Sequence, residues 1–91
     1  FEKPDLEKFP CIRLAYEALK EGGTFPVVLN VANDEVVTAF LNKHIQFSDI
    51  PHLIEDAMNQ HEFIDSPDLE TISAISFWTV NYIHDEILTF A

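Results

Sequence analysis

Four histidines are the side chains of this sequence best suited to metal chemistry. A helical zinc site needs two histidines four residues apart with an acid nearby, so that their ring nitrogens converge on one ion. His44, His52, His61 and His84 do not have that spacing. His52 and Asp56 share a helical face, which is more typical of an exposed ionic contact than of half a metal site. The spacing therefore predicts no metal ligand.

The other reactive groups also lack catalytic partners. Cys11 has only Arg13 as a cationic neighbour and no histidine, so it is interpreted as a small core residue and not as a nucleophile. The carboxylates at 55–56 and 85–86 are adjacent in sequence and cannot face each other as a general acid and base must. The glycines at 22–23 lack the three-glycine spacing of a dinucleotide turn. We therefore predict no catalytic, cofactor-binding or metal-binding residue in this chain.

Asp65 and Ser66 suggest one further class, the acyl carrier proteins. These small acidic helical bundles attach their prosthetic group to a serine that opens a helix in an Asp-Ser-Leu motif. Pro67 takes the place of that leucine here. A helix cap at Ser66 accounts for the local sequence without any prosthetic group, so the carrier interpretation is weak.

The charge of the chain is unevenly distributed along the sequence. Its formal net charge is −11, and every lysine and arginine lies within residues 1–43. An acidic surface repels phosphate backbones and anionic headgroups, so we expect no nucleic acid and no membrane as partners. No apolar run approaches the length of about 20 residues that spans a bilayer. A free-standing acidic helical module that binds another protein remains the alternative function.

Hydrophobic periodicity predicts an all-α fold, a small helical bundle with three strong helices and a split C-terminal helical arm. The strong helices are expected at residues 10–20, 24–41 and 50–60. Gly22 and Gly23 end the first helix and turn the chain into an antiparallel hairpin. The expected core positions are Cys11, Leu14, Ala15, Ala18 and Leu19 in the first helix, Leu29, Ala32, Val36, Ala39 and Phe40 in the second, and Ile50, Leu53, Ile54, Ala57 and Met58 in the third.

Two serines are expected to divide the C-terminal arm. Ser66 would cap a short helix over residues 67–74, and Ser76 would cap a last helix over residues 77–90. The last helix would direct Val80, Ile83 and Ile87 to the core, while Phe77, Trp78 and Tyr82 widen its apolar surface toward a partner domain.

Caps and buried amides complete the expectations for the other elements. Thr24 is expected to cap the second helix, and Ser48 or Asp49 the third. Asn33 is expected to be buried and hydrogen-bonded, and Asn30 to lie nearer the flank.

The organisation expected for the whole chain is simple. Residues 1–9 read as an extended lead-in from a missing upstream domain, and residues 10–91 as a single helical-bundle domain.

Five short motifs follow one another in the first 50 residues: a Phe and a Pro-Asp pair in 1–5, Phe-Pro-Cys at 9–11, Gly-Gly at 22–23, Leu-Asn-Val-Ala-Asn-Asp at 29–34 and Phe-Ser-Asp-Ile at 47–50. In this order and spacing the chain resembles a known family, the C-terminal helical domain of 1-deoxy-D-xylulose 5-phosphate reductoisomerase. Two positions depart from the family pattern: Asp34 replaces the usual glutamate, and Val80 stands where an arginine commonly follows the tryptophan.

The resemblance implies a part of an enzyme that converts 1-deoxy-D-xylulose 5-phosphate to 2-C-methyl-D-erythritol 4-phosphate in non-mevalonate isoprenoid biosynthesis. The parent enzyme uses NADPH and a divalent metal, Mg or Mn, bound in upstream domains, and no family catalytic position maps onto this chain. The resemblance further implies a structural domain that buttresses the central catalytic domain of the same chain, a homodimeric parent, and a bacterial cytoplasm or a plastid-type organelle. The 91 residues alone are expected to be inactive and to leave NADPH unbound.

Overall fold

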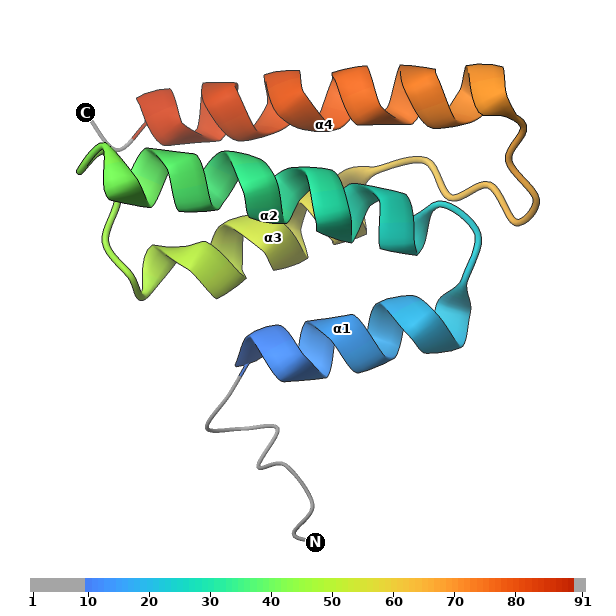
Figure 1. Ribbon diagram of the computed structural model, residues 1–91, viewed down its shortest axis with the longest axis horizontal. Helices are drawn as coiled ribbons and strands as arrows, with labels where there is room; N and C mark the ends of the chain where they lie inside the picture. Colours follow the sequence, from blue (N-terminus) through green and yellow to red (C-terminus); the bar gives the residue numbers. More distant parts are fainter. Residues whose placement is uncertain (1–9, 90–91) are drawn as a thin grey trace, which may run out of the picture.

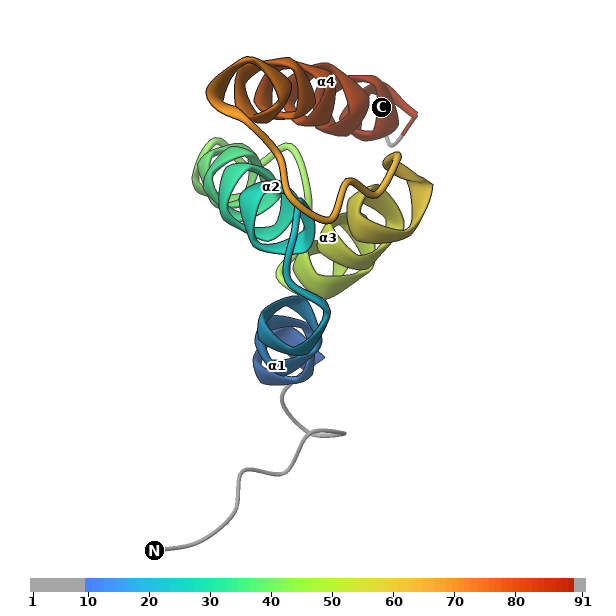
Figure 2. The ribbon, with the colours of Figure 1, turned by 90° about the vertical axis from the view of Figure 1, so that its right-hand side faces the viewer.

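The computed structural model describes residues 10–89, which form four α-helices: α1 Pro10–Glu21, α2 Phe25–Leu41, α3 Asp49–Gln60 and α4 Leu69–Leu88. The predicted lead-in at 1–9 lies outside these described residues. Figure 1 shows α2 and α3 between α4 on one side and α1 on the other, and the perpendicular view in Figure 2 shows the same order. Within the described part of the chain α2 contacts all three other helices, whereas α1 and α4 do not touch. The predicted all-helical bundle is confirmed.

The hydrophobic core surrounds α2, where the apolar faces of the helices meet. Five core residues predicted for α3 are all buried: Ile50, Leu53, Ile54, Ala57 and Met58. The other buried apolar residues are Leu14 and Ala18 of α1, Val28, Ala32, Val36 and Ala39 of α2, Ile45 of the α2–α3 connector and Ile83 of α4. Full burial of a leucine or isoleucine side chain contributes about 1.5–3 kcal/mol, so this cluster is the main source of stability.

Helix α1 buries less of its surface than its periodicity predicts. Leu14 and Ala18 are 1% and 0% exposed, but Leu19 is 76% exposed. Cys11 is exposed as well, so its interpretation as a core residue is wrong. The reason is the position of α1 at the edge of the bundle, where only one narrow side of the helix meets α2 and α3.

The prediction that Asn33 is buried is wrong, since Asn33 and Asn30 are both exposed. Val28, which the predicted apolar face omits, is fully buried. Including Val28 rotates the centre of the buried face away from Asn33, because each residue turns a helix by about 100°. Leu29 and Phe40 consequently lie at the edge of that face and are only partly buried.

The predicted split of the C-terminal arm is wrong, because α4 is one helix of 20 residues. Its N-cap is Asp68, whose Oδ1 accepts a hydrogen bond of 2.8 Å from the backbone N–H of Thr71. Ser76 lies inside the helix. One side of α4 faces the core without interruption across this region. Its residues follow at four-residue spacing and are buried or packed against the core: Ile75, Thr79, Ile83 and Ile87. A continuous inward face outweighs the modest cost of a serine in a helix interior.

The two glycines between α1 and α2 behave as predicted. Gly22 and Gly23 have φ values of 68° and 55°, and this left-handed backbone ends α1 and reverses the chain. The direction of the ribbon in Figure 1 shows α1 and α2 running antiparallel. A Cβ atom at Gly23 would collide with the carbonyl oxygen of Ile64, whereas one at Gly22 would meet nothing within 4 Å.

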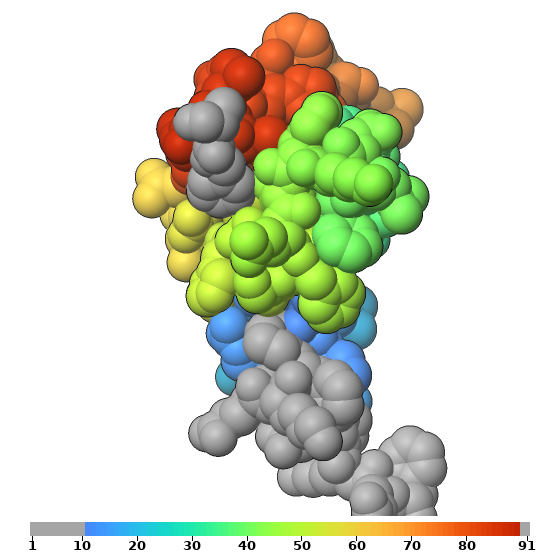
Figure 3. Space-filling model, turned by 90° about the vertical axis from the view of Figure 1, so that its left-hand side faces the viewer, coloured from blue at the N-terminus to red at the C-terminus, as the bar shows by residue number. Residues whose placement is uncertain are grey.

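Thr24 and Ser48 occupy the N-cap positions of α2 and α3, as predicted, but neither makes a side-chain cap hydrogen bond. Asp49 instead accepts a hydrogen bond of 2.9 Å from the backbone N–H of Gln46. Figure 3 shows this end of the molecule, where the connector from α2 to α3 lies between α4 and α1. Over the described residues, no helix is long and apolar enough to cross a membrane.

Candidate functional site

A buried polar cluster in the described structure joins two connectors that are far apart in sequence. Thr24, 0% exposed, lies at the start of α2, and His61, 7% exposed, follows α3. The Thr24 hydroxyl lies 2.8 Å from His61 Nε2 and accepts a hydrogen bond of 3.0 Å from the Ile64 backbone N–H. The Thr24 backbone N–H donates in turn to the Ile64 carbonyl at 3.0 Å. We call Thr24, His61 and Ile64 the connector clasp.

Hydrogen-bond counting assigns the proton positions in the connector clasp. His61 Nδ1 lies 2.5 Å from the carbonyl oxygen of Met58. A carbonyl can only accept, so Nδ1 carries the proton and Nε2 accepts from the Thr24 hydroxyl. The ring of Phe25 packs edge-on against the imidazole with a centroid separation of 4.8 Å. Every polar side-chain atom of the clasp is thereby paired, and the arrangement serves to hold two connectors together.

The other histidines lie at the surface. His84 Nε2 is 2.8 Å from Glu35 Oε2, in a hollow of about 440 Å³ that His44 also borders. His52 is exposed on α3. No three His, Cys, Asp or Glu side chains within residues 10–89 are arranged to hold a metal ion. The four histidines that sequence spacing left separate are therefore not brought together as a ligand set.

A groove of about 330 Å³ between α1 and α3 is lined by charged and apolar side chains in similar measure. Arg13 bridges its walls, with hydrogen-bonded contacts of 2.6 Å to Glu55 and 3.0 Å to Glu17. The bond to Glu55 is the main cause that raises the pKa of the Arg13 guanidinium. The two carboxylates at 55–56, both predicted to be solvated, therefore differ in their surroundings. Glu55 forms an ion pair between α1 and α3, whereas Asp56 is exposed.

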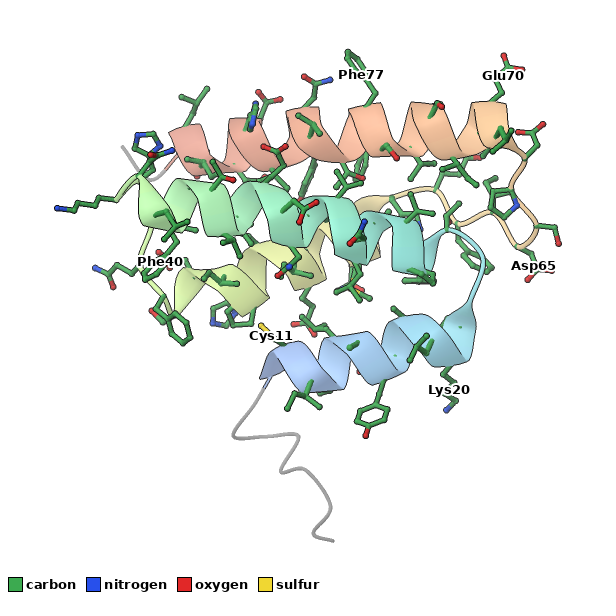
Figure 4. All side chains as sticks on the ribbon, in the orientation of Figure 1. Cys11, Lys20, Phe40, Asp65, Glu70 and Phe77 are labelled. Atoms are coloured by element: carbon green, nitrogen blue, oxygen red, sulfur yellow. The ribbon has the colours of Figure 1, made fainter. Side chains whose placement is uncertain are left out.

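Cys11 and Ser66 lack the surroundings that their chemistry would need. Partial burial raises the pKa of the Cys11 thiol, which disfavours the reactive thiolate. Ser66 is exposed in the connector before α4 and does not open that helix, because Asp68 is its N-cap. Figure 4 shows neighbouring Asp65 at the tip of the same connector. The serine therefore does not occupy the position that a carrier-protein serine has.

The donor groups of the described residues do not fit NADPH or a divalent metal. NADPH phosphates need backbone N–H groups at a glycine-rich turn or basic side chains. Glu17, Glu21 and Glu55 border the α1–α3 groove and outnumber its one basic lining residue, Lys20. Arg13 is already paired with Glu17 and Glu55.

The geometry defines a class of protein: a small all-helical domain held together by an apolar core and one clasp between connectors. The sequence matches the family described as DXP reductoisomerase C-terminal domain over residues 1–82. This chain belongs to that family.

Relatives extend the match over most of the chain. The 1-deoxy-D-xylulose 5-phosphate reductoisomerase of Halothermothrix orenii is 53% identical over 78 residues, which are 86% of this chain and 20% of that protein. The enzyme of the same name from Acetivibrio thermocellus is 46% identical over 85 residues, 93% of this chain and 22% of that protein. The chain therefore spans about a fifth of the length of these relatives.

A solved structure has the same fold. It is the 1-deoxy-D-xylulose 5-phosphate reductoisomerase from Zymomonas mobilis in complex with NADPH, which aligns with a TM-score of 0.85 and 38% identity over 96% of this chain and 23% of that one. The alternative of a free-standing acidic interaction module receives no support from these matches.

Sequence reasoning missed the connector clasp. Thr24 was interpreted as a helix cap, and His61 lay in a stretch without periodicity. The two residues are 37 positions apart, and no local pattern joins positions that far apart. The paired glycines beside Thr24 were the one available signal, because they mark a place where another backbone segment approaches closely.

Proposed function

We propose that residues 10–91 form the single C-terminal domain of a 1-deoxy-D-xylulose 5-phosphate reductoisomerase and buttress its central catalytic domain. One observation carries this proposal: a solved enzyme of that name matches 96% of the chain with a TM-score of 0.85. A helical bundle packed against a catalytic domain adds buried area and restricts the relative motion of the two. The domain thus contributes to catalysis by fixing geometry and not by supplying reactive groups.

The parent enzyme, on this proposal, converts 1-deoxy-D-xylulose 5-phosphate to 2-C-methyl-D-erythritol 4-phosphate. NADPH would supply the hydride and a divalent ion, Mg or Mn, would act as a Lewis acid, and we propose that residues outside this chain hold both. The named relatives are bacterial, which supports a bacterial cytoplasmic enzyme and gives no support to a plastid. We propose a homodimeric parent.

A chimera tests this function directly. The matched segment of the Halothermothrix orenii enzyme is replaced by this chain, and NADPH oxidation with 1-deoxy-D-xylulose 5-phosphate is followed by absorbance. The chimera should keep kcat/KM close to that of the unmodified enzyme. Deletion of the same segment should lower kcat/KM on the order of a hundredfold, since small displacements of a catalytic site have effects of that size.

Two outcomes would count against the proposal. One is a chimera that is folded by circular dichroism and gel filtration but no more active than the deletion variant. The other is a deletion variant with full activity and unchanged thermal stability, because a buttress that can be removed without effect is not one.

A further inference from the structure

Helix α1 has a second apolar side that the bundle leaves uncovered. Its inward side carries Leu14 and Ala18, which are 1% and 0% exposed. Ile12, Tyr16 and Leu19 are 38%, 52% and 76% exposed and follow at intervals of four and three residues. Side chains with this spacing form one line along a helix. We call these three residues the outer stripe of α1.

The outer stripe is uncharged in a chain whose net charge is −11. The charged residues of α1 lie on a different edge of the helix, where Glu17 borders the groove toward α3 and Arg13 pairs with Glu17 and Glu55. In Figure 4 the side of α1 that faces away from the other helices carries several side chains, with the labelled Lys20 at its end. An apolar line bordered by charged residues is typical of a surface that another protein surface covers.

The sequence pattern had suggested α4 as the surface for a partner, but the structure weakens that expectation. Trp78 and Tyr82 stack on each other with ring centroids 4.9 Å apart and are each partly buried. Phe77 points away from the bundle in Figure 4. Leu69, the next exposed large apolar residue, is eight positions away, or about 12 Å along a helix. The exposed apolar residues of α4 are therefore scattered, whereas those of α1 are contiguous.

The attachment of α1 to its own bundle is slight. Of its side chains at 11–21, whose burial the structure describes, only Leu14 and Ala18 are buried, and one ion pair, Arg13 to Glu55, joins it to α3. A helix of 12 residues is marginal in water without packing on its apolar face. A protein surface packed on the outer stripe would bury the apolar side chains of α1 that the bundle leaves exposed.

The position of α1 in the chain identifies what covers the stripe. This chain spans about a fifth of its relatives and matches a family described as a C-terminal domain, so the rest of the parent lies upstream. The upstream part joins through residues 1–9, which reach about 32 Å at full extension. The chain from the upstream part therefore reaches the described bundle at the start of α1, which keeps that part close to α1. The outer face of α4, in contrast, lies on the opposite side of α2 and α3 (Figure 2).

We propose that Ile12, Tyr16 and Leu19 are the surface through which this domain packs against the central catalytic domain of its own parent chain, an inference that rests on the proposed function. The contact extends the hydrophobic core across the domain boundary, with α1 as the shared layer. The charged edge with Arg13 and Glu17 forms the polar rim of the contact.

Hydroxyl-radical footprinting of the full-length parent enzyme tests the contact. Leu19 and Leu88 are matched probes, because both are leucines and are 76% and 71% exposed in the domain. Interface cores pack as densely as protein interiors, so oxidation of Leu19 should fall on the order of tenfold below that of Leu88. Leu69 and Leu41, which are 83% and 72% exposed, are further controls and should react like Leu88.

The footprint separates failure of this inference from failure of the proposed function. Protection of Leu69 or Leu88 with full oxidation of Leu19 would place the contact on α4 and overturn the inference, while the buttress role would stand. Full oxidation of all four leucines would leave no packed face and would overturn both. Protection of Leu19, with or without another leucine, supports the outer stripe.

Paired variants of the full-length enzyme give an independent readout. Tyr16→Asp with Leu19→Asp should speed thermal inactivation on the order of tenfold, because central interface residues carry most of the contact free energy. Leu69→Asp with Leu88→Asp should change that rate less than about twofold, as expected for substitutions at surface positions. Equal inactivation rates for the two double variants would overturn the inference.

Discussion

Replacing Thr24 with valine removes one hydroxyl group from a fully buried position and leaves the volume of the side chain nearly unchanged. Two hydrogen bonds disappear with the hydroxyl. His61 Nε2 loses its donor at 2.8 Å, and the Ile64 backbone N–H loses its acceptor at 3.0 Å. Because the substituted methyl group can replace neither role, the connector clasp keeps only its backbone hydrogen bond from Thr24 to Ile64.

The expected magnitude follows from the burial of the two groups left unpaired. A buried polar group without a partner costs about 1–3 kcal/mol. His61 is buried and Ile64 is half-buried, so Ile64 contributes from the lower end of that range. We expect Thr24→Val to lower the free energy of unfolding by about 3 kcal/mol, which for a domain of this size corresponds to a Tm lower by roughly 12–24 °C.

Urea denaturation of the 91-residue chain, followed by far-UV circular dichroism, measures this loss. Thr38→Val is the matched control, because the Thr38 hydroxyl is exposed and donates only to the Asp34 carbonyl of its own helix. That variant should change stability by less than about 0.5 kcal/mol. Amide exchange adds a local readout, since the N–H of Ile64 should exchange faster in Thr24→Val alone. Equal unfolding midpoints for the two valine variants would refute the clasp as a source of stability.

Three further changes test other features of the fold. Gly23→Ala should destabilise the domain more than Gly22→Ala in the same denaturation assay; both positions have positive φ, which costs about 1–2 kcal/mol, but only a Cβ at Gly23 would approach to 2.7 Å of Phe63 Cε2. Asp68 accepts hydrogen bonds from Thr71, and these hold the pKa of its carboxyl below the ordinary value of 3.8. The Thr71 side chain has the larger effect and the Thr71 backbone N–H the smaller one. The stability from its ionised form is therefore present above pH 3.8 and lost as the pH falls through the folded pKa, and Asp68→Asn should lack this acid-dependent loss in pH-dependent melts. Ile83→Ala, at a position with 0% exposure, should lower the free energy of unfolding by about 2–5 kcal/mol, measured by thermal melts.

Local periodicity predicts a helix well where every apolar residue of its stripe faces other helices. Helix α3 is such a case, and all five predicted positions are buried. Helix α1 has the same kind of stripe, but the bundle covers only Leu14 and Ala18. The sequence shows which residues of a helix are apolar. It does not show how many of them the neighbouring helices will cover, because those helices come from distant parts of the chain.

Capping residues misled the prediction of α4 for a related reason. Ser66, Ser76 and Asp68 are all favourable cap residues, and preference alone does not choose among them. The choice depends on the phase of the inward face through Ile75 and Ile83, which only the packed structure reveals. The connector clasp was beyond local reasoning altogether, because it depends on a contact across 37 residues.

The position of the connector clasp has a consequence for how the domain would bear mechanical load. Tension applied through residues 1–9 enters the bundle at α1, whose contacts with the rest are few. The load next reaches Gly22 and Gly23, and then Thr24, which is anchored to His61 and Ile64. Rupture would therefore peel α1 first and stop at the clasp, with α2, α3 and α4 still folded as one unit. Motion of an upstream domain could loosen the first helix without unfolding the remaining three.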